Sequence, residues 1–171
     1  YEQSFRENRE MSAVTDYFSG ETYSYYGFAK EIAKLHILFD EAGIKHGDKI
    51  ALVGRNTPRW CVVYIATITY GAVIVPIMQT FTSNDIAHIV NHSGSRLLFL
   101  TDSYWEGLDE DALPEVEAVF SITDYHALYE RNGERLTKFV NAMTENYRKR
   151  YPNGFTVSDI KYADVPNDSL M

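Results

Sequence analysis

Apolar residues between positions 28 and 39 recur with the period of an α-helix. They are spaced four, three and four residues apart, which places them on one helix face. The residues of this stripe are Phe28, Ile32, Leu35 and Phe39. Ser24 is a suitable N-cap before the stripe, and Gly43 suits the C′ position after it. The pattern predicts a long amphipathic helix between these two residues.

The pattern then changes to short apolar runs that alternate with helical stretches. The runs predicted as strands are Lys49–Val53, Ala72–Pro76 and Leu97–Leu100. The helices between them are expected from Pro58, after an N-cap at Asn56 or Thr57, to about Tyr70, and from a Thr82–Asp85 capping box to Ser93 and Gly94. Alternating strands and helices with short connections predict an α/β fold, a mostly parallel sheet flanked by helices.

The two ends of the chain give weaker patterns. At the start we expect a short helix over Tyr1–Arg9 and a hairpin of Ala13–Tyr17 and Glu21–Ser24. After Leu100 we expect an acidic helical stretch (Ser103–Asp111), a strand (Ala118–Ile122), a mixed segment (Asp124–Arg131), one amphipathic helix marked by Phe139, Val140, Met143 and Tyr147 and running to Tyr151, and a loop after Pro152. We divide the chain into an entry helix and hairpin (1–24), an alternating core (25–122) and a helical insertion with a loop (123–171).

One stretch, Trp60–Phe81, contains no charged residue and is long enough to cross a bilayer. Gly71 and Pro76 interrupt it, and its pattern changes from helical to β-branched partway along. A helix, a glycine turn and a core strand therefore explain it better than a transmembrane span.

Composition narrows the class of protein. The chain has 171 residues with 45% hydrophobic residues, which favours one folded domain over a disordered chain. Its net charge of −8 disfavours nucleic acid as a partner. The single cysteine, Cys61, forms no disulfide within the chain, and no secretory signal follows Tyr1. These features predict a cytoplasmic, reducing location and a chain that starts inside a longer protein.

The turn over residues 54–59 is the best local candidate for binding chemistry. Such a turn from strand to helix exposes backbone N–H groups to an anion, and Arg55 and Arg59 lie beside it. An ordinary N-cap at Asn56, with Pro58 just inside the helix, explains the same residue types without a ligand, and no glycine-rich phosphate motif is present. We favour the cap.

Other candidate sites have simpler interpretations. Ser93, Gly94 and Ser95 are read as a helix end, because no lysine or second glycine follows. The histidines are His36, His46, His88, His92 and His126; His88 and His92 share a helix face without the glutamate of an HExxH motif. Glu106, Asp109, Glu110 and Asp111 are read as a solvated run, and Arg148, Lys149 and Arg150 as a basic helix end. The residues alone therefore show no active site.

As one string, residues 22–102 resemble the amino-terminal part of the AMP-forming acyl-CoA synthetases, the adenylate-forming ligases. The matching pieces, in order, are Thr22-Tyr23, Gly43–Asp48 (GIKHGD), Asn56 with Trp60, Gly71–Pro76 (GAVIVP), Thr82–Ile89, and Asn91–Gly94 followed by Leu97–Thr101. Trp60, four residues after Asn56, and the PIMQT stretch are most similar to the long-chain fatty-acid CoA ligases. Residues 164–171 (DVPNDSLM) resemble the approach to the family's phosphate-binding loop, which ends in lysine.

The resemblance implies an amino-terminal fragment of an ATP-dependent ligase. Such enzymes join a fatty acid to CoA through an acyl-adenylate and use ATP, Mg²⁺ and CoA. Their catalytic groups would lie beyond Met171, so no catalytic, cofactor-binding or metal-ligating residue is assigned to this chain, and no cofactor is expected on it. The chain would supply scaffold and a wall of the acyl or pantetheine channel. The expected partners are the remainder of the polypeptide and the three substrates, with peripheral membrane attachment open for the full-length protein.

A different class of function stays open: a stand-alone, non-enzymatic α/β module that binds a small molecule. For the fragment we expect no ligase activity. We also expect self-association, because a sheet that is cut partway through exposes apolar surface. The strand Ala118–Ile122 and the helix carrying Phe139 are the expected sites of that exposed surface. The alternative is that this helix folds back over the sheet and keeps the chain monomeric.

Overall fold

The computed structural model describes residues 1–164; residues 165–171, which hold nearly all of the stretch that resembles the approach to a phosphate loop, lie outside the described residues. Its centre is a five-stranded sheet with the strand order β4-β3-β5-β6-β7. The strands are β3 (Lys49–Val53), β4 (Val73–Ile77), β5 (Ser95–Leu100), β6 (Ala118–Ser121) and β7 (Ala127–Glu130). The first four in that order pair in parallel, and β7 pairs with β6 in the antiparallel sense. The predicted α/β class with a mostly parallel sheet is confirmed.

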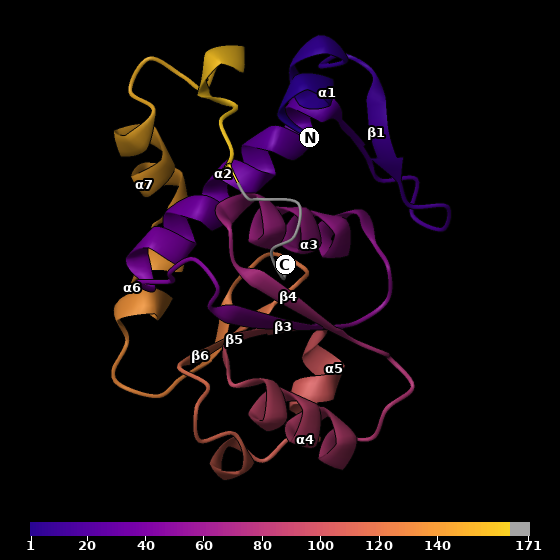
Figure 1. Ribbon diagram of the computed structural model, residues 1–171, viewed down its shortest axis with the longest axis vertical. Helices are drawn as coiled ribbons and strands as arrows, with labels where there is room; N and C mark the ends of the chain where they lie inside the picture. Colours follow the sequence, from indigo (N-terminus) through magenta and orange to yellow (C-terminus); the bar gives the residue numbers. More distant parts are fainter. Residues whose placement is uncertain (165–171) are drawn as a thin grey trace.

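Helices cover both faces of the sheet (Figure 1). The helices are α2 (Tyr25–Glu41) and α3 (Pro58–Tyr70) on one face, and α4 (Ser83–Ser93) and the short α5 (Asp102–Trp105) on the other. A hydrophobic core lies on each face of the sheet, and alternate residues of β3 point into one or the other. Ile50 and Leu52 pack on the α2 and α3 side, and Ala51 and Val53 pack on the α4 side. Burial on both faces explains why these strands are apolar runs without alternation.

The predicted caps set the bounds of the long helices. Ser24 caps α2 through its hydroxyl, which accepts a hydrogen bond from Gly27 N. Thr82 and Asp85 form the predicted capping box of α4. Gly94 ends α4 in the left-handed conformation, with φ of 68°. The Ser93-Gly94-Ser95 stretch is thus a helix end, as predicted.

The uncharged stretch Trp60–Phe81 divides into α3, a turn at Gly71 and β4, as predicted. Within residues 1–164, no helix is both long and apolar enough to span a membrane. The expected end of the strand at Pro76 is wrong, because β4 continues to Ile77. Proline is tolerated there because β4 is an edge strand and one of its sides needs no N–H donor.

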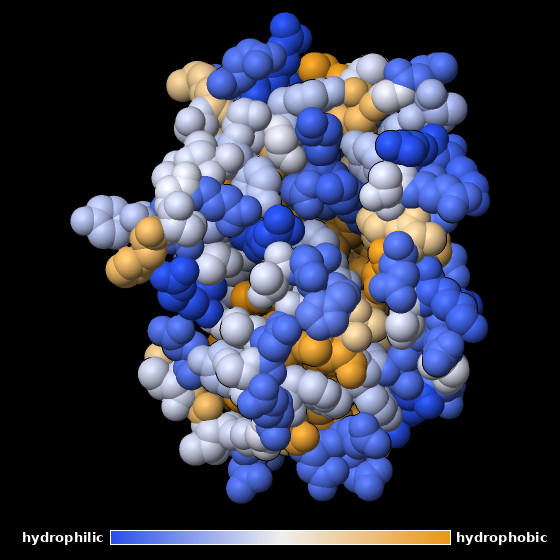
Figure 2. Space-filling model, turned by 180° about the vertical axis from the view of Figure 1, so that it is seen from behind, coloured by the Kyte–Doolittle hydropathy of each residue, from blue (hydrophilic) through white to orange (hydrophobic). Residues whose placement is uncertain are grey.

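The chain opens with α1 (Glu2–Glu7) and a separate two-stranded hairpin, β1 (Ser12–Thr15) and β2 (Thr22–Ser24). Both strands are shorter than expected at their loop ends. The Asp16 side chain causes this, because its Oδ1 accepts a hydrogen bond from Phe18 N at 2.8 Å and turns the chain immediately after β1. The loop between the strands projects from the body of the molecule (Figures 1 and 2).

Several expectations for the second half of the chain are wrong. The acidic stretch forms only α5 and a 3-10 turn, η1 (Glu110–Ala112), and the mixed segment contains β7. The single amphipathic helix is two helices, α6 (Arg135–Asn141) and α7 (Met143–Arg150), and a 3-10 turn, η2 (Val157–Asp159), lies in the expected loop. The helix breaks at Ala142, and Asn146 Nδ2 donates to the carbonyl of Phe139 at 3.0 Å, which compensates for the break.

The prediction of which surface truncation exposes is also wrong. The β6 residues Ala118, Val119 and Phe120 are fully buried, because β5 and β7 pair with the strand on both sides. The apolar residues of α6 and α7, including Phe139, pack against the core that α2 shares with the sheet. The exposed large apolar side chains lie elsewhere: Tyr1, Met11, Tyr17, Phe18, Met78 and Phe81.

Dense polar contacts lie near the end of the sheet where the parallel strands begin. Arg96 pairs with Asp48 at 2.5 Å and with Glu117 at 2.7 Å, and it also donates to the carbonyls of Gly43 and Ala42. Nearby, between α2 and α3, His36 Nε2 lies 3.0 Å from the carbonyl of Ala66. Burial lowers the pKa of His36 to about 4, so the imidazole is neutral at pH 7 and Nε2 donates this hydrogen bond.

Candidate functional site

The opposite end of the sheet, where the parallel strands finish, carries the turn that the sequence singled out. Thr57 is the N-cap of α3: its Oγ1 accepts a hydrogen bond from Trp60 N at 3.2 Å, and Pro58 occupies the first helical turn. Of the two residues offered by the sequence as the cap, Thr57 is therefore the cap, and Asn56 is exposed. The ordinary cap is present, as predicted.

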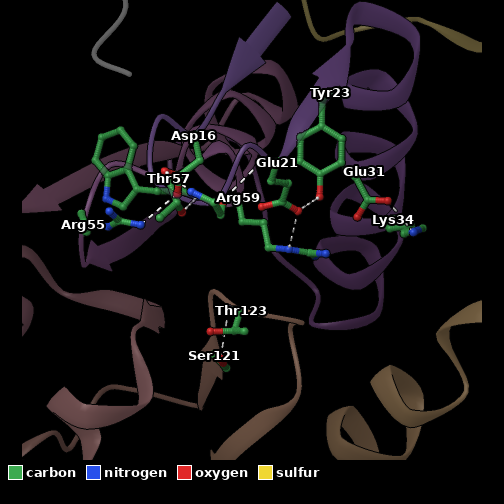
Figure 3. Close-up of polar contacts among 12 residues, drawn as sticks. Asp16, Glu21, Tyr23, Glu31, Lys34, Arg55, Thr57, Arg59, Ser121 and Thr123 are labelled. Atoms are coloured by element: carbon green, nitrogen blue, oxygen red, sulfur yellow. Dashed lines mark hydrogen bonds and ion pairs between the residues drawn. The ribbon is translucent and has the colours of Figure 1, made fainter.

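Both arginines of this turn bind carboxylates of the amino-terminal hairpin (Figure 3). Arg55 Nη2 lies 2.8 Å from Asp16 Oδ2, and Arg59 Nε lies 3.6 Å from Glu21 Oε1. The guanidinium of Arg55 also lies 4.9 Å from the ring centroid of Phe18. The loop between Asp16 and Glu21 is thus attached at both ends to the beginning of α3, and the arginines are not free for a phosphate.

Sequence reasoning missed the tyrosines around Arg59. Tyr23 donates its hydroxyl to Glu21 at 3.0 Å, and burial raises the pKa of Tyr23 to about 12. Tyr125, 5% exposed, lies with its ring centroid 5.7 Å from the Arg59 guanidinium and has a φ of 68°. No pattern in the sequence marks a buried tyrosine with left-handed backbone; this position follows from the sharp turn after β6.

The crevice beside β3 is filled by side chains. The strand order places the reversal of direction between β3 and β5, the position where open α/β sheets bind ligands. A Cβ atom added to Gly54, which follows β3, would lie 2.8 Å from both Thr101 Oγ1 and Ile122 Cδ1. The backbone at Gly54 therefore packs closely against Thr101 and Ile122, and a side chain at this position would have no room.

A pocket of about 580 Å³ opens next to this crevice, at the ends of β3 and β4. Its lining residues are Gly54, Arg55, Asn56, Trp60, Pro76, Ile77, Met78, Gln79 and Thr80. The size is that of a site for a small organic molecule. Much of the wall is apolar, and Arg55 is the charged residue among those that line it. The pocket thus joins the GAVIVP and PIMQT stretches to the turn that the sequence singled out.

Ser121 and His126, near the ends of β6 and β7, lie close to Asp102 but do not form a catalytic triad. Ser121 Oγ donates to Asp102 Oδ1 at 2.5 Å and accepts from Thr123 N at 3.0 Å. His126 Nδ1 is 2.5 Å from Asp124, and its Nε2 is 3.7 Å from Asp102. A nucleophilic serine would have to donate to the histidine. These contacts instead fix the turn between the two strands.

The remaining candidates are surface features. His88 and His92 are exposed, and their rings stack with centroids 6.1 Å apart. Over residues 1–164 no group of three or more His, Cys, Asp or Glu side chains is placed to hold a metal ion. Asp109 caps the turn η1, and the basic cluster over residues 148–150 forms the last turn of α7.

Comparison with known proteins decides the family. The sequence profile of the family described as AMP-binding enzyme matches residues 1–163. The chain belongs to the AMP-binding enzyme family.

Among curated relatives, a fatty acid–[acyl-carrier-protein] ligase of Streptomyces coeruleorubidus is 24% identical over 74% of this chain and 24% of its own length. The crotonobetaine/carnitine–CoA ligase of Proteus mirabilis is 30% identical over 60% of this chain and 20% of its own length. The crystal structure of an anthranilate CoA ligase in complex with anthranoyl-AMP shares the fold, with a TM-score of 0.69 and 14% identity over 82% of this chain and 26% of that one. The chain thus spans about a quarter of the length of such proteins.

Proposed function

We propose that this chain is the amino-terminal part of an AMP-forming ligase that joins a long-chain fatty acid to CoA. The observation that carries the proposal is the match of the AMP-binding enzyme profile to residues 1–163. Relatives named as ligases of fatty acids, carnitine and acetate match segments of the chain, which supports an acid as the substrate class. The long-chain preference rests on Trp60 and the PIMQT stretch and on a relative named long chain acyl-CoA synthetase 1.

In the proposed reaction, the fatty-acid carboxylate attacks the α-phosphate of ATP and displaces pyrophosphate to give acyl-adenylate. The CoA thiol then loses its proton and attacks the acyl carbon, which displaces AMP and gives acyl-CoA. A Mg²⁺ ion would offset the negative charge of the phosphates. Residues 25–122 would supply part of the sheet scaffold, residues 1–24 the hairpin attached to it, and residues 123–171 the helical insertion. The pocket at the ends of β3 and β4 would form a wall of the acyl or pantetheine channel. The groups that bind phosphate would come from the remainder of the polypeptide, in a cytoplasmic enzyme.

Acid-dependent exchange of pyrophosphate into ATP tests the proposal. We expect the full-length protein to catalyse exchange with palmitate more efficiently than with acetate or benzoate, and the 171-residue chain to show none. Exchange that prefers acetate would overturn the long-chain assignment. Exchange by the short chain alone would overturn the placement of the phosphate-binding groups outside it.

The closed core supports one alternative, a stand-alone binding module. All six β5 residues except Arg96 are buried, and β6 is buried throughout, so the described residues form a core without help. Calorimetric titration with ATP and AMP separates the two functions. Micromolar affinity of the 171-residue chain for either nucleotide would favour the module, because the ligase proposal places the phosphate-binding loop elsewhere.

A further inference from the structure

A second pocket, of about 370 Å³, lies between α2, the end of α3 and the segment that begins at the end of α7. The helix α7 lies beside α2 (Figure 1). This pocket shares no lining residue with the pocket at the ends of β3 and β4. Its wall carries four charged side chains whose charges balance: Asp40 and Asp159 are negative, and Arg150 and Lys161 are positive.

The other titratable groups in this wall add no charge at pH 7. His36 is neutral there, because burial lowers its pKa to about 4, and its Nε2 donates to the carbonyl of Ala66. Burial raises the pKa of Tyr70, and its hydroxyl donates to Asp40 at 2.7 Å. Burial also raises the pKa of Tyr151. The charge that a ligand meets in the pocket therefore comes from the two carboxylates and the two cations.

Hydrogen bonds hold both carboxylates in place and leave one oxygen atom of each available. Asp159 Oδ2 accepts from the backbone N and from the hydroxyl of Thr156, each at 2.7 Å. Asp40 Oδ1 accepts from Tyr70. Within residues 1–164 no hydrogen bond reaches the second oxygen of either carboxylate. Each of these oxygens can accept a hydrogen bond from a cationic group.

The two cations of the pocket form no ion pair within residues 1–164. At the end of α7, Lys149 pairs with Glu145 at 2.7 Å, whereas the guanidinium of Arg150 lies 5.8 Å from the ring centroid of Tyr151. Arg150 and Lys161 are both exposed. Exposed ion pairs contribute little to stability, so both side chains are available to a ligand. Opposite charges thus share this pocket without neutralising one another directly.

We propose that this pocket binds a small zwitterion, a molecule with one ammonium group and one carboxylate. The carboxylate contacts Arg150 and Lys161, and the ammonium group contacts Asp40. An anion alone would be repelled by the two carboxylates of the wall, and a cation alone by the two cations, whereas a zwitterion matches both. The site is independent of the proposed ligase function and is tested without ATP, CoA or a fatty acid.

Titration of the isotope-labelled 171-residue chain, followed by nuclear magnetic resonance, tests the proposal. The zwitterionic probes are glycine, β-alanine, γ-aminobutyrate and ε-aminocaproate, which differ in the separation of their two charges. Butyrate and butylamine carry one charge each. We expect at least one zwitterion to bind about fivefold more tightly than either single-charge probe. The amide shifts should gather at residues 36–40, 70 and 150–161. Equal affinity for all probes, or shifts centred elsewhere, would overturn the proposal.

Two variants assign the charges. The double substitution Arg150→Gln, Lys161→Gln should remove the preference for the zwitterion over butylamine, and Asp40→Asn should remove the preference over butyrate. The control Arg148→Gln, Lys45→Gln changes the net charge equally at exposed positions outside the pocket and should leave both preferences intact. Preferences that persist in the first two variants, or that vanish in the control, would contradict the assignment.

Ser158→Asp provides a check that keeps all four charged groups, because Ser158 is exposed and lines the pocket. The added negative charge should weaken butyrate binding and strengthen butylamine binding, each about threefold. Circular dichroism confirms the fold of each variant. Identical effects of Ser158→Asp on the two probes would show that their charged groups lie outside this pocket, which overturns the proposal even if Asp40→Asn fails to fold.

Discussion

The two ends of the parallel sheet use arginine in different ways. Where the strands begin, Arg96 is 28% exposed and holds two carboxylates and two carbonyls, which connect β3, β5 and the loop after α2. Where the strands finish, Arg55 is 50% exposed and holds one carboxylate of a hairpin outside the sheet. Arg96, with four acceptors, connects several parts of the fold, whereas Arg55 has one carboxylate partner and lies beside a pocket. We call the end where the strands begin the closed end, because Arg96 and its partners fill it, and the end where they finish the open end, because the pocket lies there.

The largest expected effect at the closed end is a pH dependence. The pKa of His36 is lowered to about 4 by burial, against about 6.5 in the unfolded chain, so the unfolded state binds more protons between these values. The stability from neutral His36 is fully present above pH 6.5 and falls as the pH drops towards 4, by on the order of 3 kcal/mol.

Urea unfolding between pH 4 and 7 measures this contribution. Substitution His36→Gln should flatten the decline, and the control His88→Gln, at an exposed position, should follow the parent. Parallel curves for His36→Gln and the parent would show that His36 titrates normally.

Gly54 lies at the end of the sheet where the strands finish, but its surroundings are tightly packed. Alanine there would place Cβ against Thr101 and Ile122 at a φ of 156°, which we expect to cost roughly 2–3 kcal/mol of unfolding free energy. Gly20→Ala is the control, since its Cβ would meet no atom within 4 Å at a φ of 73°. Urea midpoints that fall equally in both variants would mean that the crevice beside β3 has room.

Arg96→Met should lower the free energy of unfolding by about 2 kcal/mol, because Asp48 and Glu117 lose their partner together. The control is Arg9→Met, whose pair with Glu10 is exposed. Arg55→Gln, measured in the same way, should leave the urea midpoint unchanged. If the Arg55 variant lost as much stability as the Arg96 variant, the distinction between the two ends would fail.

The smallest effect concerns association. Tyr17 and Phe18 are 92% and 79% exposed at the tip of the hairpin, and such side chains favour weak contacts between copies. Light scattering at high micromolar concentration should give a weight-average mass slightly above the monomer. A Tyr17→Ser, Phe18→Ser double variant should return it to the monomer value. A parent chain that stays monomeric throughout would remove the proposal of self-association.

The closed end and the core could be predicted from the sequence because their signals are local. The stripe before Gly43, the Thr82–Asp85 box and the β-branched runs each fix an element within a few residues. β7 could not be found this way: its four residues are all half-buried, without alternation, and only pairing with β6 makes them a strand. The helices on the two sides of the break at Ala142, α6 and α7, both contact α2, which lies far away in the sequence.

The candidate site was only partly predictable for the same reason. The turn over residues 54–59 was found from its residue types, but the partners of its arginines lie about forty residues earlier in the chain, at Asp16 and Glu21. Nothing in a single sequence indicates that Asp16 and Arg55 form an ion pair. The pocket lies where the segments after β3 and β4 meet, which composition and spacing do not encode.

Reading the coding sequence beyond Met171 tests the central claim most directly. The ligase account predicts a Ser-, Thr- and Gly-rich loop ending in lysine within a few residues of DVPNDSLM, followed by the remaining three quarters of a synthetase. Such a loop would supply the backbone donors and the lysine that phosphoryl chemistry needs. A stop codon at residue 171, or a continuing frame without that loop, would contradict the account.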